Sequence, residues 1–279
     1  MKMAERMVAA LFILGLLAGC DRSDGQEALS TTEAHHDSHV GHKSNEHGDA
    51  KRMKAALSFR SGAAKAKEEA ELAVRITDPA GGPVKDFELN HEKLLHLIVV
   101  SEDLSYFSHL HPSYQGNGIF RLPLTFPAGG KYKVFADFKP VGGNSTTVGQ
   151  WLTVEGTPMK AESIQVDLGR AKEVAGKEIA LTPLTLKANE ETTLTFSFRD
   201  ARTKEQITDL EPYLGATGHV VILSRDAGHY LHVHPLDEAS TGPEARFVTS
   251  FPQPGIYKIW GQFQHRGKVI TVPFVVQVE

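Results

Sequence analysis

The chain has 279 residues, with 30 lysine and arginine side chains against 34 acidic ones, a formal net charge of −4 and a single cysteine. A mildly acidic chain without a basic patch is not typical of nucleic-acid-binding proteins, so we expect no nucleic acid among its partners. One cysteine allows no disulfide between the folded domains, whose stability must then come from apolar cores.

The first 20 residues have the features of an export signal. Lys2 and Arg6 provide a positive start, and the apolar run that follows is too short to span a bilayer as a helix. The sequence Leu-Ala-Gly-Cys at positions 17–20 resembles the lipobox of bacterial lipoproteins. This resemblance implies removal of residues 1–19 and acylation of Cys20, so we expect a lipid, not a membrane-spanning helix, to hold the protein at the membrane.

Asp21 directly follows the predicted lipidation site. In enteric-type lipoproteins, an aspartate at this position resembles the signal for retention in the inner membrane. The resemblance implies a protein on the periplasmic side of that membrane, outside the cytoplasm.

Residues 20–53 are rich in histidine and poor in large apolar side chains. Such a segment cannot bury enough apolar surface to offset the entropy of ordering it, so we expect a disordered tether. Closely spaced imidazoles on a mobile chain can chelate borderline metals weakly, and a solvated spacer is the alternative interpretation. The histidines of this tail are His35, His36, His39, His42 and His47.

Alternating apolar and polar residues predict two all-β repeats, at 54–157 and 175–279, joined by a linker at 158–174. In the first repeat, Leu72, Val74 and Ile76 would share one face of a half-buried strand. Short strands between Gly, Pro, Asn and Asp turns, in repeats of about one hundred residues, predict an internal duplication. We expect two tandem antiparallel β-sandwich domains of the immunoglobulin or cupredoxin type.

The clearest sign of duplication is a gapless pair of segments at 96–112 and 219–235, which share a His and a His-x-His-Pro pattern. A hairpin closed by residues 102–105 would place Ile98 opposite His109, with three imidazoles on one face. A slip of one residue would turn His96 to the other face. The predicted metal ligands are His96, His109 and His111 in the first repeat, and His219, His232 and His234 in the second.

Three neutral imidazoles with an open position suit Cu(II) or Zn(II), which we therefore expect as the bound ion. The alternative is that these histidines satisfy buried backbone groups or stack on aromatic rings. His229 and His265 have no counterpart in the first repeat, so they are extra ligands at best. Asp103 and Asp226 lie in the two hairpin loops, where a carboxylate stabilises a turn by bonding its own backbone.

The combination of a lipobox, a histidine-rich tail and tandem HLHP and HVHP domains resembles bacterial exported proteins such as the YtkA-like group. The resemblance implies an extracytoplasmic module for metal handling. We thus expect capture, buffering or delivery of the ion without catalysis, with the metal, the membrane and an envelope metal-transport protein as partners.

Two alternatives stay open. One is a non-catalytic envelope interaction module with structural histidines, since a sandwich fold does not determine function. The other is a metal-dependent enzyme with cupin-like or dismutase-like chemistry. His232, His234 and Glu238 have the His-x-His-x3-Glu spacing of cupins, but the cupin glycines and second motif are absent, and the first repeat has no acid at that place.

Overall fold

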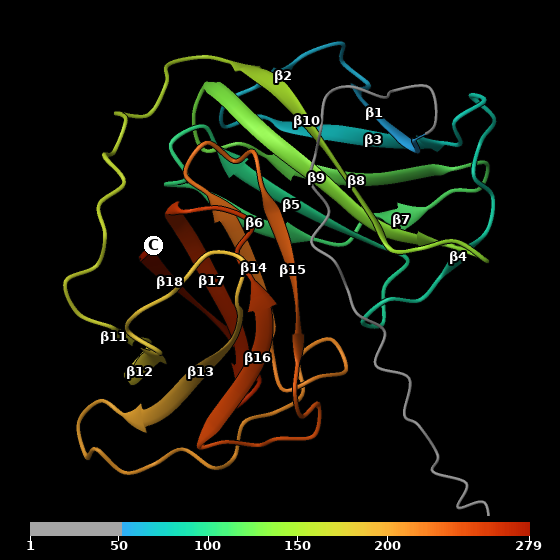
Figure 1. The fold of residues 1–279 in the computed structure, drawn as a ribbon. Coiled ribbons are helices and arrows are strands. Elements are labelled where there is room, and N and C mark those ends of the chain that lie inside the picture. Colours follow the sequence, from blue (N-terminus) through green and yellow to red (C-terminus); the bar gives the residue numbers. More distant parts are fainter. Residues whose placement is uncertain (1–51) are drawn as a thin grey trace, which may run out of the picture. The chain divides into compact units, whose positions relative to one another are not determined.

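The computed structural model describes residues 52–279, and the observations below concern this range. All of these residues belong to one compact unit. All regular elements of this range are β-strands (Figure 1). None of its elements is a helix long and apolar enough to cross a membrane.

The first repeat contains two sheets. One has the spatial order β1-β3-β8-β7, and the other has the order β2-β10-β9-β5-β6, with β4 paired to β9. The strands are β1 (Lys54–Phe59), β2 (Ala64–Lys65), β3 (Glu69–Thr77), β4 (Phe87–Glu88), β5 (Leu95–Ser101), β6 (Phe107–Leu110), β7 (Ser113–Tyr114), β8 (Ile119–Thr125), β9 (Gly130–Pro140) and β10 (Thr146–Glu155).

The second repeat follows the same course, but its strands form one continuous path of hydrogen bonds in the order β11-β12-β13-β16-β15-β14-β17-β18. The path is continuous because β15 pairs with β14 at one end and with β16 at the other. The strands are β11 (Ala171–Val174), β12 (Lys177–Thr182), β13 (Glu191–Asp200), β14 (His219–Ser224), β15 (Tyr230–Pro235), β16 (Glu244–Ser250), β17 (Gly255–His265) and β18 (Lys268–Val278).

Each repeat has its own apolar core, which confirms the predicted pair of tandem β-sandwiches. Leu72, Val74 and Ile76 of β3 are fully buried in the first core, as their alternation with polar residues predicts. Leu194 and Phe196 occupy the corresponding positions of β13 in the second core. The strands of the second repeat begin at Ala171, within the expected linker, because residues 171–174 pair with β12.

The central strands β5 and β14 differ from β3, because every one of their residues is buried. One face of each strand belongs to the core of its own repeat. The other face packs against the opposite repeat in a third apolar cluster. Strands covered on both faces have near-continuous apolar sequences, as in residues 97–100 and 220–223.

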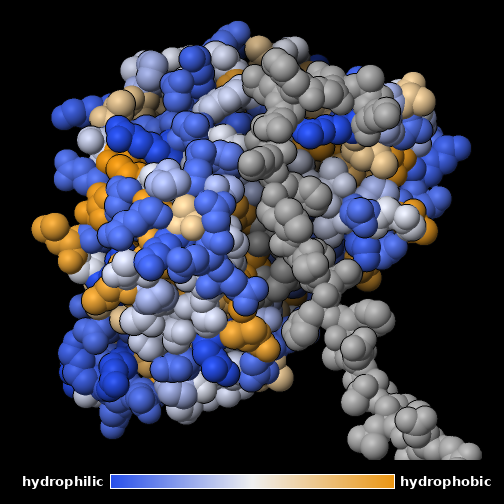
Figure 2. Space-filling model, viewed as in Figure 1, coloured by the Kyte–Doolittle hydropathy of each residue, from blue (hydrophilic) through white to orange (hydrophobic). Residues whose placement is uncertain are grey.

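The surface is mostly polar. Figure 2 shows hydrophilic side chains over most of one face, with apolar residues scattered among them. The exposed large apolar residues of the described range lie mostly in loops spread along the chain, which is ordinary for the surface of a folded protein. The third apolar cluster, in contrast, is buried and contains residues of both repeats.

Candidate metal centre

The contact between the repeats is built from four short rows of side chains that point out of the two sheets. In the first repeat, β5 and β9 pair so that Val100 lies opposite Lys133, Ile98 opposite Phe135, and His96 opposite Asp137. In the second repeat, β14 and β17 give the matching pairs Leu223 with Lys258, Val221 with Trp260, and His219 with Gln262. Because side chains alternate along a strand, the three residues of each row lie on the same face of their strand. Each row contributes one residue to each of three layers: a lysine layer, an apolar layer in the middle and a histidine layer.

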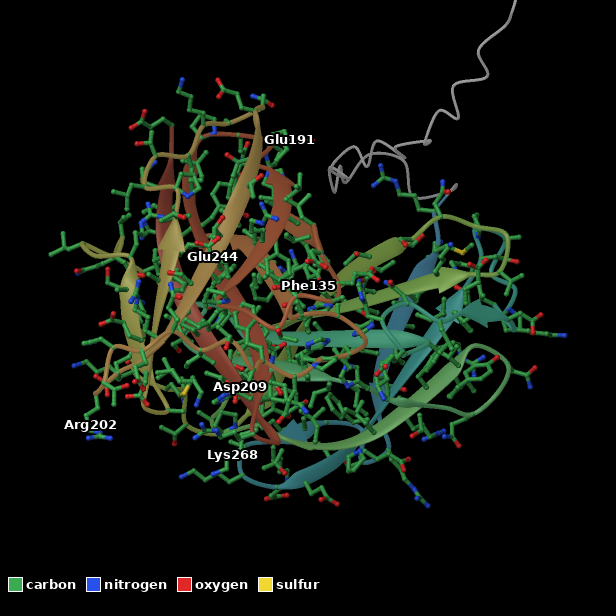
Figure 3. The ribbon with its side chains drawn as sticks, turned by 90° about the horizontal axis from the view of Figure 1, so that it is seen from below. Phe135, Glu191, Arg202, Asp209, Glu244 and Lys268 are labelled. Carbon is green, nitrogen blue, oxygen red and sulfur yellow. The ribbon has the colours of Figure 1, made fainter. Side chains whose placement is uncertain are left out.

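The middle layer is apolar. Ile98 and Phe135 from the first repeat pack with Val221 and Trp260 from the second. Phe107 stacks on Trp260 with ring centroids 4.7 Å apart, and the corresponding pair, Tyr230 and Phe135, lies at 5.1 Å. Figure 3 labels Phe135 at the centre, where the strands of the two repeats face each other. Burial of these rings is the main attraction between the repeats.

The lysine layer, at one end of the contact, contains one lysine from each repeat. Lys133 donates a hydrogen bond of 2.7 Å to the carbonyl oxygen of Ala227, and Lys258 donates one of 2.7 Å to the carbonyl oxygen of Leu104. Leu104 and Ala227 are themselves equivalent hairpin-loop residues with positive φ angles of 56° and 54°. Each repeat thus offers the other the same donor and the same acceptor.

Two carboxylates hold these loops, as predicted. Asp103 accepts hydrogen bonds from the Ser101 hydroxyl at 2.6 Å and from the Ser105 backbone at 3.1 Å. Asp226 accepts one from the Ser224 hydroxyl, also at 2.6 Å. Burial raises the pKa of Asp103, but these hydrogen bonds outweigh it and lower the pKa to about 2.

These reciprocal contacts relate the two repeats by a pseudo-two-fold axis. A contact of this type is isologous, since the same patch is used on both sides. The axis passes through the layered contact, so residues near it come together from both repeats. This arrangement differs from the expected one, in which each repeat holds its own histidine set.

The histidine layer, at the other end of the contact, is a cluster of imidazole rings. The predicted hairpin register is confirmed, because Ile98 pairs with His109. One ring nitrogen each from His96, His109 and His219 lie within 4.8 Å of one another, a spacing that fits a single metal ion. His96 and His219 are buried, at 0% and 5% exposure, and His109 is partly exposed. The group therefore combines two strands of the first repeat with one of the second.

Hydrogen bonds determine which nitrogens can bind a cation. His96 Nε2 lies 2.7 Å from the carbonyl oxygen of Asn90, which can only accept, so Nε2 carries the hydrogen and Nδ1 presents a lone pair. His109 Nδ1 lies 2.7 Å from Gln262 Oε1, which also only accepts, so His109 Nε2 presents a lone pair. The inner nitrogens, His96 Nδ1 and His109 Nε2, lie 2.9 Å apart, and in these tautomers each presents a lone pair to the other.

The cluster resists protonation, so a proton is a poor bridge between those lone pairs. Burial, together with repulsion from His96, lowers the pKa of His109 to about 3. Burial is also the main reason that the pKa of His111 falls to about 4. At neutral pH both rings are neutral and keep a lone pair for a metal ion.

Two more described histidines lie beside this group. The His111 ring is 4.7 Å from that of His109 and 5.0 Å from that of His96, and its Nε2 atom is buried without a hydrogen-bond partner. The His91 ring is 5.5 Å from that of His219. The repeat pattern does not reveal His91, because the matching turn of the second repeat has Leu214 at the equivalent position.

Asp137 and Gln262 were also missed. Both are buried, at 1% and 6% exposure, and both precede matched phenylalanines, Phe138 and Phe263. Their positions directly before these phenylalanines mark them as equivalent in the two repeats. One is an acid and the other an amide, however, so the pair does not form a repeated motif. Asp137, which has a buried carboxylate, pairs directly with the predicted ligand His96 in the β5–β9 ladder.

The remaining predicted site residues have different outcomes. The strand positions of His232 and His234 in β15 are described, whereas their side chains are not. Cys20 and the tail histidines lie outside the described residues, and so do the signal and lipobox predictions. His265 donates to Asp209 at 3.0 Å, and neither it nor His229 belongs to the metal-ligand group found among the described residues.

Several solved bacterial proteins are similar to the chain at low identity. The Escherichia coli adhesin FdeC is 14% identical, with 82% of this chain and 66% of that chain covered and a TM-score of 0.27. An integrin-binding invasin is 15% identical, with coverage of 80% and 39% and a TM-score of 0.23. The D0-D1 domain of intimin is 12% identical, with coverage of 82% and 97% and a TM-score of 0.24.

The chain thus spans 66% of the length of the FdeC chain and 39% of that of the invasin. No curated protein matches the chain. The resemblance to the YtkA-like group stays a prediction.

One family matches the chain twice, over residues 49–156 and 172–279. These two ranges cover most of the chain and correspond to the two β-sandwich repeats, which confirms the duplication. The chain belongs to the family described as "Domain of unknown function (DUF8832)" and contains two tandem copies of that domain.

Proposed function

We propose that this protein is an extracytoplasmic, lipid-anchored module that binds Cu(II) or Zn(II) between its two repeats, without catalysing a reaction. The observation that carries the proposal is the convergence of ring nitrogens from His96, His109 and His219 within 4.8 Å, with His96 Nδ1 and His109 Nε2 2.9 Å apart. With the Gln262 amide oxygen towards His109, both of these nitrogens present lone pairs. Two lone pairs repel each other unless a cation lies between them. Nitrogens bound to one tetrahedral zinc ion are about 3.3 Å apart, so a small outward movement would admit the ion.

The outer hydrogen bonds support a metal site. A metal-bound histidine usually donates its other ring N–H to a carbonyl or carboxylate oxygen, which fixes the tautomer and the direction of the ring. His96 has this arrangement with Asn90, and His109 has it with Gln262. Imidazole nitrogen is a preferred ligand of both zinc and copper.

Burial supports binding without catalysis. A catalytic metal keeps an open position for water or substrate, whereas a structural or storage site surrounds the ion with protein ligands. His96 and His219 are buried, and the apolar layer lies directly beside them on the same strands. Capture, buffering or delivery of the ion then follows, with the tail histidines collecting it and an envelope metal-transport protein exchanging it.

The test is a calorimetric titration with ZnCl₂ and CuCl₂ of the full chain in which the five tail histidines are replaced by alanine. We expect one ion per chain with submicromolar affinity. His109→Gln should weaken binding at least about 100-fold, a loss of about 2.7 kcal/mol, and the control His229→Gln should leave it unchanged. Absence of binding by a folded protein, checked by circular dichroism, would refute the proposal.

A second candidate is an envelope interaction module in which the histidines are structural. The Gln262 amide favours it, because exchanging its oxygen and nitrogen gives a closed network without a metal. The amide nitrogen would donate to His109 Nδ1, and His109 Nε2 would donate to His96 Nδ1. Thr271, now 3.2 Å from the amide nitrogen, would donate its hydroxyl hydrogen to the amide oxygen.

Gln262→Glu separates the two candidates, because a carboxylate only accepts hydrogen bonds. A metal site would keep or strengthen Zn(II) binding, since a carboxylate makes the ligand histidine more basic. A structural network would lose its donor and destabilise the metal-free protein by about 1–3 kcal/mol. Urea unfolding and zinc titration of the same variant distinguish these results.

A further inference from the structure

The separations between imidazole rings describe the geometry of the histidine layer. The His96 ring centroid is 5.2 Å from that of His109 and 5.4 Å from that of His219, and the centroids of His109 and His219 are 4.7 Å apart. The His111 centroid is 4.7 Å from that of His109 and 5.0 Å from that of His96. Five of the six separations among these four rings are therefore nearly equal.

Nearly equal separations match a tetrahedral ion. Because zinc–nitrogen bonds are about 2.0–2.1 Å long, rings bound to one tetrahedral ion have centroids about 5 Å apart in every pair. A square-planar ion, the arrangement that Cu(II) prefers, would place its two opposite pairs of rings about 6.5 Å apart. At most one pair here could have that separation, because the other five are 4.7–5.4 Å. The four rings thus favour Zn(II) over Cu(II).

His111 Nε2 gives an independent observation. This atom is buried and has no hydrogen-bond partner among the described residues. Buried polar atoms are nearly always paired with protein, water or an ion, so an atom without a partner indicates a ligand. His111 directly follows β6, two residues after His109, and its ring is partly exposed, whereas His96 and His219 are buried.

We propose that His111 is the fourth ligand of a tetrahedral Zn(II) ion that is also held by His96, His109 and His219. The proposal rests on the function proposed above and deepens it by completing the ligand set and naming the metal. His111 is not among the three residues whose nitrogens converge within 4.8 Å, so its ring must turn to bring Nε2 to the ion. Because that ring is partly exposed, it can turn without separating the repeats, and His111 closes behind the ion.

His91 is the other partly exposed histidine beside the cluster. Its ring centroid is 5.5 Å from that of His219 but 6.3 Å from that of His96, which is too far for two ligands of one tetrahedral ion. His111, in contrast, lies at the tetrahedral separation from two ligands of the ion. The same substitution at His91 is therefore a matched control for one at His111.

The first experiment tests whether the ion has an open position, in the full chain with the five tail histidines replaced by alanine. Co(II) serves as a spectroscopic substitute for zinc, because tetrahedral Co(II) absorbs visible light far more strongly than octahedral Co(II). Four protein ligands leave no place for a small anion, so added azide should not change the visible bands of the parent protein. In His111→Leu, water takes the fourth position, and azide should displace it and change the bands.

The second experiment compares zinc affinity with the stability of the metal-free protein. His111→Leu should weaken Zn(II) binding at least about tenfold in a competition titration, because one of four ligands is lost. It should not lower the free energy of unfolding of the metal-free protein, because it replaces a buried polar atom without a partner by an apolar group. His91→Leu should keep the zinc affinity and the azide response of the parent protein.

The outcomes separate this proposal from the proposed function. Unchanged zinc affinity in His111→Leu, or an azide response in the parent protein, would refute the fourth ligand and leave the metal function intact. A loss of affinity in His91→Leu as large as that in His111→Leu would also refute the assignment of His111. A folded parent protein that binds neither Zn(II) nor Co(II) would refute the proposed function itself.

Discussion

The lysine end and the histidine end of the contact between the repeats differ in how their polar groups are hydrogen-bonded. At the lysine end, each ammonium group meets a backbone carbonyl of the other repeat, and both partners are satisfied. At the histidine end, the outer nitrogens of His96 and His109 meet oxygen acceptors, and their inner nitrogens lie 2.9 Å apart with roles that depend on the tautomers. The lysine layer thus has a complete set of hydrogen bonds, whereas the histidine layer is the place for which we propose a metal ion.

The largest effect should come from the apolar layer. Trp260→Ala removes a buried ring that stacks on Phe107, and we expect the protein to lose about 3–5 kcal/mol of unfolding free energy. Phe135→Ala, the equivalent change in the first repeat, should cost a similar amount. Urea unfolding measures both, and a loss below about 1 kcal/mol for both would show that this layer does not hold the repeats together.

The lysine layer should contribute less. Lys258→Met keeps most of the side-chain volume but leaves the Leu104 carbonyl without its donor, at a cost of about 1–3 kcal/mol. Lys133→Met should behave in the same way through Ala227. Unfolding of the single and double variants tests this, and stability equal to that of the parent protein would contradict the reciprocal contact.

Acid should weaken the lysine end through the Asp103 turn. The folded-state pKa of Asp103, about 2, lies below its ordinary value of 3.8, so the turn stabilises the fold above pH 3.8 and loses this contribution as the pH falls towards 2. We expect about 1–2 kcal/mol after allowing for solvent screening. Asp103→Asn should reduce the loss of unfolding free energy between pH 3.8 and 2. An unchanged loss in this variant would contradict the stabilising role of the Asp103 turn.

The smallest effect should appear at the outer edge of the histidine end. Thr271→Val removes the hydroxyl that holds the Gln262 amide nitrogen, so the amide can turn its nitrogen towards His109. We expect zinc affinity to fall by less than about tenfold, or 1.4 kcal/mol. Competition titration against a chelator measures this change, and tighter binding would contradict the assigned orientation of the amide.

The sequence predicted the fold because its local patterns agree with each other. Alternation at Leu72, Val74 and Ile76 identified a half-buried strand, and the equal length of the two hairpins set the register that joins Ile98 to His109. The turn roles of Asp103 and Asp226 also followed from loop chemistry. These features depend on residues within one or two neighbouring strands.

The shared histidine site could not be predicted in this way. A row such as His96, Ile98 and Val100 shows that a strand has a second apolar face, but not what covers that face. The contact joins residues more than one hundred positions apart, as His109 and Gln262 show. Asp137 and Gln262 are equivalent in space but differ in chemistry, so the repeat pattern does not reveal them.

The most direct test of the central claim is a crystal structure of the zinc-loaded protein with anomalous data collected at the zinc edge. We expect one strong anomalous peak between the repeats, about 2.0–2.1 Å from His96 Nδ1 and from His109 Nε2. A well-ordered cluster with no peak there, in which the Gln262 amide nitrogen donates to His109, would contradict the proposed metal site and leave the histidines with a structural role.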